Sequence, residues 1–170
     1  DERIRLSLPT LQFLLEAGAR VILLSHLGRP EKEFDQQFSL LPVAQKLNEL
    51  AFGLIGYKKK VLFFPKTIGR LAGNKVKKLE KGQMLLLENL RFYPGEEENK
   101  PAFSKRLAKL GNFYINDAFS VSHREHASVV GLPGLLPSAA GLALEKEVNN
   151  LIRLTNNPDR PLVLVVGGIK

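Results

Sequence analysis

The sequence contains no cysteine among its 170 residues. This absence excludes disulfides, thiolate nucleophiles and sulfur-ligated metal sites, and it is compatible with a reducing compartment. Long apolar runs are also missing: residues 162–166 form one of the longest, far below the roughly 18 to 20 residues of a membrane-spanning helix. No signal-peptide pattern opens the sequence. From these absences we expect a soluble, cytoplasmic protein.

The length and composition fit one domain of ordinary size with a single main core. Hydrophobic residues make up 44% and charged residues 25% of the chain, which excludes a disordered or collagen-like protein. The formal net charge is +8, so nucleic acid, a membrane surface and a small anionic ligand are all candidate partners.

The distribution of the basic residues separates these candidates. Lysines gather at residues 58–60 and 75–81, where few aromatic side chains are available for base stacking. We interpret these stretches as solvated connections, with a polyanion-binding patch as the alternative. Several arginines instead follow apolar runs directly, beside His, Gly or Asn, at positions where a phosphate could be held: Arg29, Arg91 and Arg124.

Apolar runs alternate with helical patterns along the chain, which is typical of parallel βαβ units. The pattern predicts strands at residues 20–25, 60–65, 83–90, 112–119 and 162–170. It predicts helices at residues 8–19, 38–53, 67–79, 101–111 and 142–154. Because near-continuous apolar strands must be covered on both faces, we expect an α/β fold, a three-layer Rossmann-like parallel sheet with helices on both faces.

Proline, serine and glycine mark the expected ends of the first two helices. Pro9 lies where the first helix is expected to start and Gly18 where it is expected to end. Ser39 is the expected N-cap of the second helix and Gly53 its expected stop.

Ligands of parallel α/β sheets bind beyond the carboxyl ends of the strands, so the residues that follow each apolar run are the candidates for a site. They are Ser25, His26, Gly28 and Arg29; Glu88, Asn89 and Arg91; Asn116, Asp117, His123, Arg124 and His126; and Gly167, Gly168 and Lys170.

All three histidines of the chain lie in these strand exits beside an arginine. His26 precedes Arg29, and His123 and His126 flank Arg124. An arginine fork and an imidazole suit a phosphate or carboxylate, because each charge-assisted hydrogen bond contributes about 1.5 to 3 kcal/mol. We therefore predict an anion site. The alternative at residues 25–29 is a plain turn in which Gly28 supplies an unusual backbone angle and Arg29 faces solvent.

Other polar clusters are less informative. A surface ion pair between Glu88 and Arg91 is an alternative to a role in the site. The acidic residues 96–98 are expected to form a solvated turn. No metal site is expected at His123 and His126, because no further ligand completes a zinc pattern. Residues 167–170 lack the complete glycine-rich loop of a nucleotide fold.

Nine short motifs occur in order across essentially the whole chain. They are ERI (2–4), SHLGRP (25–30), SLLPVA (39–44), LLLENLRF (85–92), EEE (96–98), INDAF (115–119), SHREHAS (122–128), LEKE (144–147) and GGIK (167–170). This ordered set resembles the N-terminal half of phosphoglycerate kinase, whose two Rossmann-like domains are joined by a helical hinge.

The resemblance implies a division of the chain into three parts. Residues 1–141 are expected to form the phosphoglycerate-binding domain, incomplete at its start because the family's first strand, with its Arg-x-Asp-x-Asn motif, precedes it. Residues 142–160 are expected to form the hinge helix and linker. Residues 161–170 are expected to be the first strand of an otherwise absent nucleotide-binding domain.

The resemblance also implies an activity: a glycolytic phosphotransferase that converts 1,3-bisphosphoglycerate and ADP to 3-phosphoglycerate and ATP with Mg²⁺. The nucleotide and metal sites would lie outside this chain, so the fragment is expected to be inactive alone. The full enzyme is expected to be a monomer, without a membrane or nucleic-acid partner.

The site residues implied by the resemblance form a basic patch. The substrate-binding set is Arg3, His26, Leu27, Gly28, Arg29, Arg91 and Arg124, with Ser120, His123 and His126 as candidates in a substrate loop. The catalytic pair is Arg3, which would neutralise charge on the moving phosphoryl group, and Lys170, which would reach it from the other domain. The sequence departs from the family at Ser120 and Val121, where Gly-Thr is usual.

Two rival functions remain open at this point. One is a non-catalytic basic module that binds nucleic acid or other polyanions through the lysine stretches. The other is a nucleotide-binding domain in its own right.

Overall fold

The computed structural model describes residues 2–31, 34–156, 158–163, 165 and 167. Three strands, β1 (Val21–Leu23), β2 (Leu62–Phe64) and β3 (Met84–Leu87), form a parallel sheet in the order β1-β3-β2. Two further strands, β4 (Tyr114–Asn116) and β5 (Ser138–Ala140), pair in parallel with each other. The parallel pairing and the helices between the strands confirm the α/β class.

Strand β3 is the central strand of the larger sheet, and all four of its residues are buried. Met84 and Leu86 face the side covered by α1 (Glu2–Glu16) and α2 (Leu41–Ile55). Leu85 and Leu87 face the other side and pack against Leu79, just after α3 (Arg70–Lys77). A strand buried on both faces has no polar alternation, as the sequence pattern predicted.

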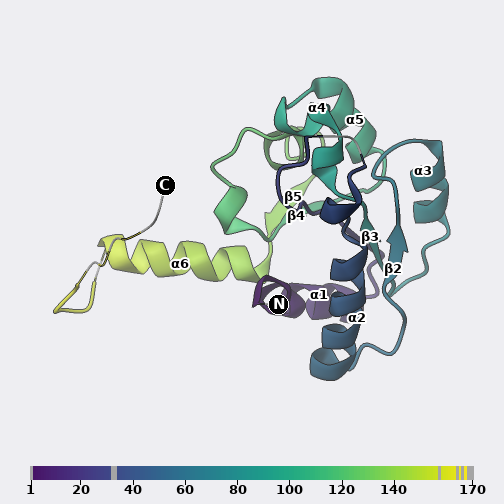
Figure 1. Ribbon diagram of the computed structural model, residues 1–170. Coiled ribbons are helices and arrows are strands. Elements are labelled where there is room, and N and C mark those ends of the chain that lie inside the picture. Colours follow the sequence, from purple (N-terminus) through teal and green to yellow (C-terminus); the bar gives the residue numbers. More distant parts are fainter. Residues whose placement is uncertain (1, 32–33, 157, 164, 166, 168–170) are drawn as a thin grey trace.

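A second apolar cluster holds the segments that carry the candidate site. It joins Leu90, which follows β3, to Phe103 and Leu107 of α5 (Pro101–Ala108) and to Ala127 in a π-helical turn, Ala127–Gly131. A short helix, α4 (Pro94–Glu97), lies beside α5 (Figure 1) and contacts the turn that contains Leu90. The exits of β3 and β4 are therefore packed against common neighbours.

Helix α6 (Leu142–Asn156) extends away from the rest of the domain, with its amino-terminal end against α1 (Figure 1). Its start is fixed by two side chains. Thr10 Oγ1 accepts from Leu142 N at 2.9 Å and donates to Asp117 Oδ1 at 2.9 Å, and Asp117 Oδ1 also accepts from Ala143 N at 3.0 Å. No residue of α6 is buried.

Three details differ from the sequence-based expectations, the first being that the N-cap of α2 is Leu40 instead of Ser39. Helix α1 runs through Pro9 instead of starting there. The carbonyl that loses its partner is that of Arg5, which is exposed, so water can satisfy it. Helix α2 passes Gly53 and ends at Ile55, where Gly56 takes a left-handed φ of 65°. Gly18, with φ 74°, does follow the end of α1 as predicted.

Strand β5 was not predicted, because its three residues, Ser-Ala-Ala, are small and exposed and give no apolar run. The strand expected at residues 162–170 lies largely on residues outside those described. None of the helices in the described ranges is both long and apolar enough to span a membrane.

The carboxylate of Glu88 connects the end of β3 to the start of α2. Oε1 accepts from Leu40 N at 2.7 Å and from Asn89 N at 2.9 Å, and Oε2 accepts from Ser39 Oγ at 2.8 Å. A buried carboxylate is favoured there because a helix amino terminus carries partial positive charge. Glu88 therefore acts as a cap for α2, and the surface ion pair with Arg91 does not form in the described structure.

We predict that Glu88→Ala lowers the free energy of unfolding by roughly 1.5 to 3 kcal/mol, because the buried Leu40 N–H loses its charged partner. Urea unfolding measures the change. Glu98→Ala is the matched control, since its side chain is 51% exposed and a surface change should stay within about 0.5 kcal/mol. Equal losses in both variants would contradict the capping role.

Candidate anion-binding site

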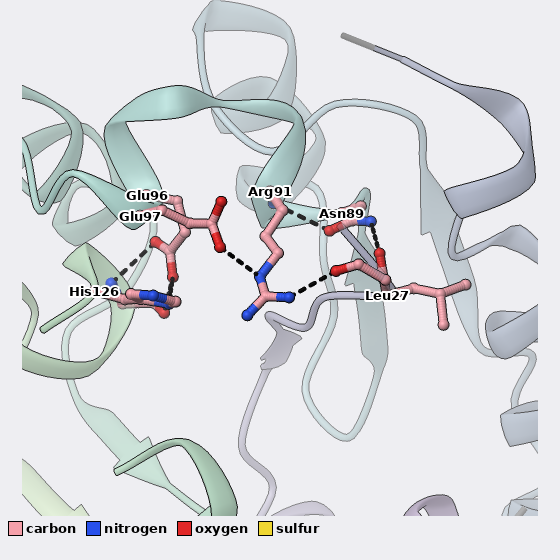
Figure 2. Close-up of polar contacts among 8 residues, drawn as sticks. Leu27, Asn89, Arg91, Glu96, Glu97 and His126 are labelled. Atoms are coloured by element: carbon pink, nitrogen blue, oxygen red, sulfur yellow. Dashed lines mark hydrogen bonds and ion pairs between the residues drawn. The ribbon is translucent and has the colours of Figure 1, made fainter. Parts of the chain in front are cut away.

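The site is built around Arg91, which lies in a 3₁₀ turn, Leu90–Phe92, directly after β3. Its side chain is buried, yet only part of the guanidinium is bonded: Nη1 donates to Gly28 O at 2.6 Å, and Nε lies 3.3 Å from Glu97 Oε1 (Figure 2). Nη2 is buried without a hydrogen-bond partner in the described structure. Such a group is available to an anion.

Asn89 holds the exit of β1 against this turn. Its Oδ1 accepts from Arg91 N at 3.0 Å and its Nδ2 donates to Leu27 O at 2.8 Å (Figure 2). The same Nδ2 also donates to Phe38 O at 2.9 Å. The amide is fully buried, and each of its groups has a partner. The loop that follows His26 is thus fixed relative to Arg91.

Gly28 is required in this loop for two reasons. Its φ of 62° lies in the left-handed region, which favours glycine. A Cβ at this position would also collide with the ring of Phe38. This is the unusual backbone angle that the plain-turn alternative assigned to Gly28, and the Gly28 carbonyl also accepts from Arg91 Nη1.

The exit of β4 supplies the opposite side of the site. Asn116 organises the first turn by accepting from Ala118 N at 3.0 Å and donating to Ser122 Oγ at 3.1 Å. Arg124 follows, and its Nε is buried without a partner in the described structure. Two arginines from neighbouring exits thus have buried, unbonded N–H groups.

Charge interactions show which residues gather around His26. Burial is the main cause, followed by the positive charges of Arg91, Arg124, His126 and Arg3, and together they lower the pKa of His26 to about 4. These groups come from four segments of the chain, so the fold brings them together. The imidazole of His26 is neutral at physiological pH and can both donate and accept a hydrogen bond.

The remaining basic residues lie at the edge of this cluster. Burial lowers the pKa of His126, with Arg91 as the next cause and His123 as a smaller one. Arg29 is among the charges that depress the pKa of Arg91, for which burial is the main cause. His123 and Arg29 therefore lie close enough to contribute to the same positive potential.

Several sequence-predicted site residues have other roles. Leu27 contributes its carbonyl to Asn89, and its side chain is 40% exposed. Ser120 lies exposed in a 3₁₀ turn, Phe119–Val121. Asp117 binds the start of α6 rather than the basic cluster. Lys170 lies outside the described residues.

Sequence reasoning missed two acidic residues of the site. The expectation that residues 96–98 form a solvated turn is wrong for Glu96, which is 2% exposed, and Glu97 pairs with Arg91 (Figure 2). The physical reason is that α4 places this run against the basic cluster, where a carboxylate compensates buried positive charge. Closeness to Arg91 in the sequence was the only available signal.

No three His, Asp or Glu side chains in the described part of the chain gather in a way that could hold a metal ion. The arrangement instead suits a phosphate or carboxylate, since a guanidinium binds either in a bidentate manner.

The chain is similar to known proteins along its whole length. The family model described as phosphoglycerate kinase matches residues 1–170. The phosphoglycerate kinase of Coprothermobacter proteolyticus is 49% identical over 170 residues, which are all of this chain and 42% of that protein. That of Thermosipho africanus is 48% identical over 170 residues, 41% of its length.

Solved structures give the same result. Phosphoglycerate kinase from Coxiella burnetii superposes with a TM-score of 0.81 at 41% identity, covering 99% of this chain and 40% of that one. Phosphoglycerate kinase from Pyrococcus horikoshii gives a TM-score of 0.81 at 32% identity, covering 95% and 40%. The chain therefore spans about two fifths of the length of these relatives.

We predict that the His26 imidazole titrates near pH 4 in the folded chain, as followed by its NMR chemical shift. The unfolded chain binds this proton near pH 6.5, so between these values it holds more protons than the folded chain. Stability should therefore fall as the pH falls from about 6.5 to 4.

The variant His26→Gln separates this effect from the titration of other groups. Urea unfolding at pH 7 and at pH 4.5 should show a larger loss of stability in the original chain than in the variant. A midpoint near 6.5 for His26, or equal losses in both proteins, would contradict the burial and charge argument.

Proposed function

The chain belongs to the phosphoglycerate kinase family, and from this premise we propose that residues 1–141 bind the phosphoglycerate substrates of a complete kinase. That enzyme would transfer a phosphoryl group from 1,3-bisphosphoglycerate to ADP and leave 3-phosphoglycerate bound to this domain. The reaction would be the glycolytic one, in the cytoplasm, with a monomeric full enzyme.

One observation carries the proposal: Arg91 Nη2 and Arg124 Nε are buried and unbonded in the described structure. Buried donors without partners are rare in folded proteins, and each costs free energy unless a ligand binds it. A phosphate or carboxylate that accepts from both arginines would remove this cost and offset their mutual repulsion. The neutral His26 adds a hydrogen-bonding group without further charge.

The resemblance adds roles for individual residues. Arg91, Arg124, Arg29 and His26 would hold the phosphate and carboxylate of the substrate, so that it cannot rotate. Arg3, in the first turn of α1, would stabilise the negative charge of the phosphoryl group during transfer. Such transfer depends mainly on positioning and electrostatics, so these residues need not react covalently.

The nucleotide and Mg²⁺ would bind elsewhere in the full enzyme. The described residues do not fit a Mg²⁺ site, because no acidic cluster of three ligands is present among them. Lys170 would reach the moving phosphate from the second domain, and this role rests on the resemblance alone.

The proposed division into a substrate domain, a hinge helix and a second domain has physical support in α6. Five large apolar residues of this helix are 37% to 50% exposed: Leu142, Val148, Leu151, Ile152 and Leu154. In the proposed full enzyme, residues 142–160 would connect the two domains and the second domain would shield part of this surface. Residues 161–170 would begin that domain.

Polyanion binding remains the second candidate function, because a hydrogen bond connects the two lysine stretches. Lys59 Nζ donates to Lys81 O at 2.8 Å, which joins residues 58–60 to the turn before β3. Affinity of these stretches for a random DNA duplex would fall steeply with salt. Binding of 3-phosphoglycerate without duplex binding at low salt would favour the kinase domain over this candidate.

We predict that the isolated chain does not form ATP from 1,3-bisphosphoglycerate and ADP in a coupled assay, because no three metal ligands gather among the described residues and residues 167–170 lack a complete glycine-rich phosphate loop. Kinases typically turn over about 1 to 100 times per second. A rate in that range from the purified chain, with the intact mass confirmed, would overturn the proposal that the nucleotide and Mg²⁺ bind elsewhere in the full enzyme.

We predict that Arg91→Ala and Arg124→Ala each weaken the binding of 3-phosphoglycerate by about 10- to 150-fold, since each removes a charge-assisted hydrogen bond. Isothermal titration calorimetry of the chain measures the change. Arg20→Ala is the matched control: it removes the same charge from an exposed position before β1, at the opposite edge of the sheet. Unchanged isotherms in both site variants would count against the proposal.

A further inference from the structure

We propose that Glu96 is a positioning residue of the anion site, which fixes the loop carrying Arg124 and His126 relative to Arg91. The inference concerns the same ligand and therefore rests on the proposed function. It begins from the arrangement of two neighbouring carboxylates in α4, which point toward different parts of the site (Figure 2).

The carboxylate of Glu96 is almost completely buried and binds one residue with both oxygens. Oε2 accepts from Ser128 N at 3.1 Å, and Oε1 accepts from Ser128 Oγ. The same Oε1 lies 3.9 Å from Nδ1 of His126 (Figure 2). Glu96 thus forms two hydrogen bonds with the segment that follows Arg124, and it lies near the imidazole of His126 in the same segment.

These contacts fix one end of the π-helical turn Ala127–Gly131, in which Ser128 is the second residue. The other end is already fixed by packing: a Cβ at Gly131 would collide with Ser104 Oγ of α5. Without Glu96, the amino-terminal end of the turn would keep the packing of Ala127 in the second apolar cluster but lose its side-chain hydrogen bonds, and it would gain freedom. Arg124 and His126 lie at that end.

Glu97 has a different task. Its Oε1 lies 3.3 Å from Arg91 Nε, and its side chain is 49% exposed, so it balances the charge of Arg91 from the solvent side. The charged groups that face Glu96 are Arg91, Glu97 and His126. Glu96 forms no hydrogen bond with either arginine in the described structure, so its effect on the ligand must pass through the loop.

A change at Glu96 can separate geometry from charge. Glu96→Ala removes both contacts to Ser128. Glu96→Gln keeps two: the amide oxygen can accept from Ser128 N while the amide nitrogen donates to Ser128 Oγ, which accepts as readily as it donates. If Glu96 acts by position, glutamine should retain most of the function. If its charge matters, glutamine should behave like alanine.

The first measurement needs no ligand. Amide hydrogen exchange of the chain should be faster at residues 126–131 in Glu96→Ala, because Ser128 N loses its acceptor. Exchange in α2 and β3 should be unchanged. Glu98→Ala, which changes the exposed neighbour in the same run, should leave both regions as they are. Unchanged exchange at residues 126–131 in Glu96→Ala would overturn the proposal.

The second measurement is calorimetric titration with 3-phosphoglycerate. Glu96→Ala should bind about tenfold more weakly, and Glu96→Gln within about twofold of the original chain. In an Arg124→Ala background the Glu96→Ala change should weaken binding little further, because the guanidinium that Glu96 positions is already absent. In an Arg91→Ala background the loss should remain. If the losses from Glu96→Ala and Arg124→Ala add, positioning through the loop is contradicted. A general effect of Glu96→Ala on folding would weaken binding equally in the Arg91→Ala and Arg124→Ala backgrounds.

Two outcomes separate this inference from the proposed function. If the original chain does not bind 3-phosphoglycerate, the proposed function fails, and hydrogen exchange alone decides whether Glu96 positions the loop. If Glu96→Ala does not fold, Ser128→Ala takes its place. It should weaken binding by a smaller factor because one of the two hydrogen bonds remains, and full affinity in that variant would overturn the proposal.

Discussion

The candidate site depends on the polar residues that end β3. Glu88 and Asn89 follow four buried residues without a break, and both are buried in turn. Glu88 binds the start of α2, while Asn89 binds the loop after β1 and the backbone of Arg91. Both oxygens of Glu88 and both amide groups of Asn89 have hydrogen-bond partners within the fold. These bonds hold the exits of β3 and β1 and the start of α2 together. The position of Arg91 is a consequence of that network.

A cluster of arginines and histidines in a partly buried site requires compensation, and the structure provides it in two ways. The first is Glu97, whose Oε1 lies 3.3 Å from Arg91 Nε. His26 reduces the repulsion by remaining neutral, since burial and the neighbouring positive charges lower its pKa to about 4. After this compensation, Arg91 Nη2 and Arg124 Nε still have no hydrogen-bond partner in the described structure. An anionic ligand completes the balance.

The sequence allowed the basic half of the site to be predicted but not the acidic half. His26, Arg91 and Arg124 lie in segments that follow apolar runs, and parallel strands bring such segments to one edge of the sheet. The role of Glu96 depends on the path of α4 and on a contact with Ser128, far along the chain. Similarly, β5 is defined by its pairing with β4 rather than by an apolar pattern. Local patterns identify residues near strand ends; they do not identify contacts made by tertiary packing.

The exit of β4 serves two parts of the molecule at once. Asp117, directly after the strand, binds Thr10 of α1 and the first turn of α6, whereas Arg124 and His126 a few residues later belong to the anion site. Asn116 and Ser122 connect these two regions through a hydrogen bond at 3.1 Å. Gly141 is required at the junction because a Cβ there would collide with the carboxylate of Asp117. The start of α6 and the loop of the anion site are therefore held by one short segment, so a displacement of either must be accommodated by the same few hydrogen bonds.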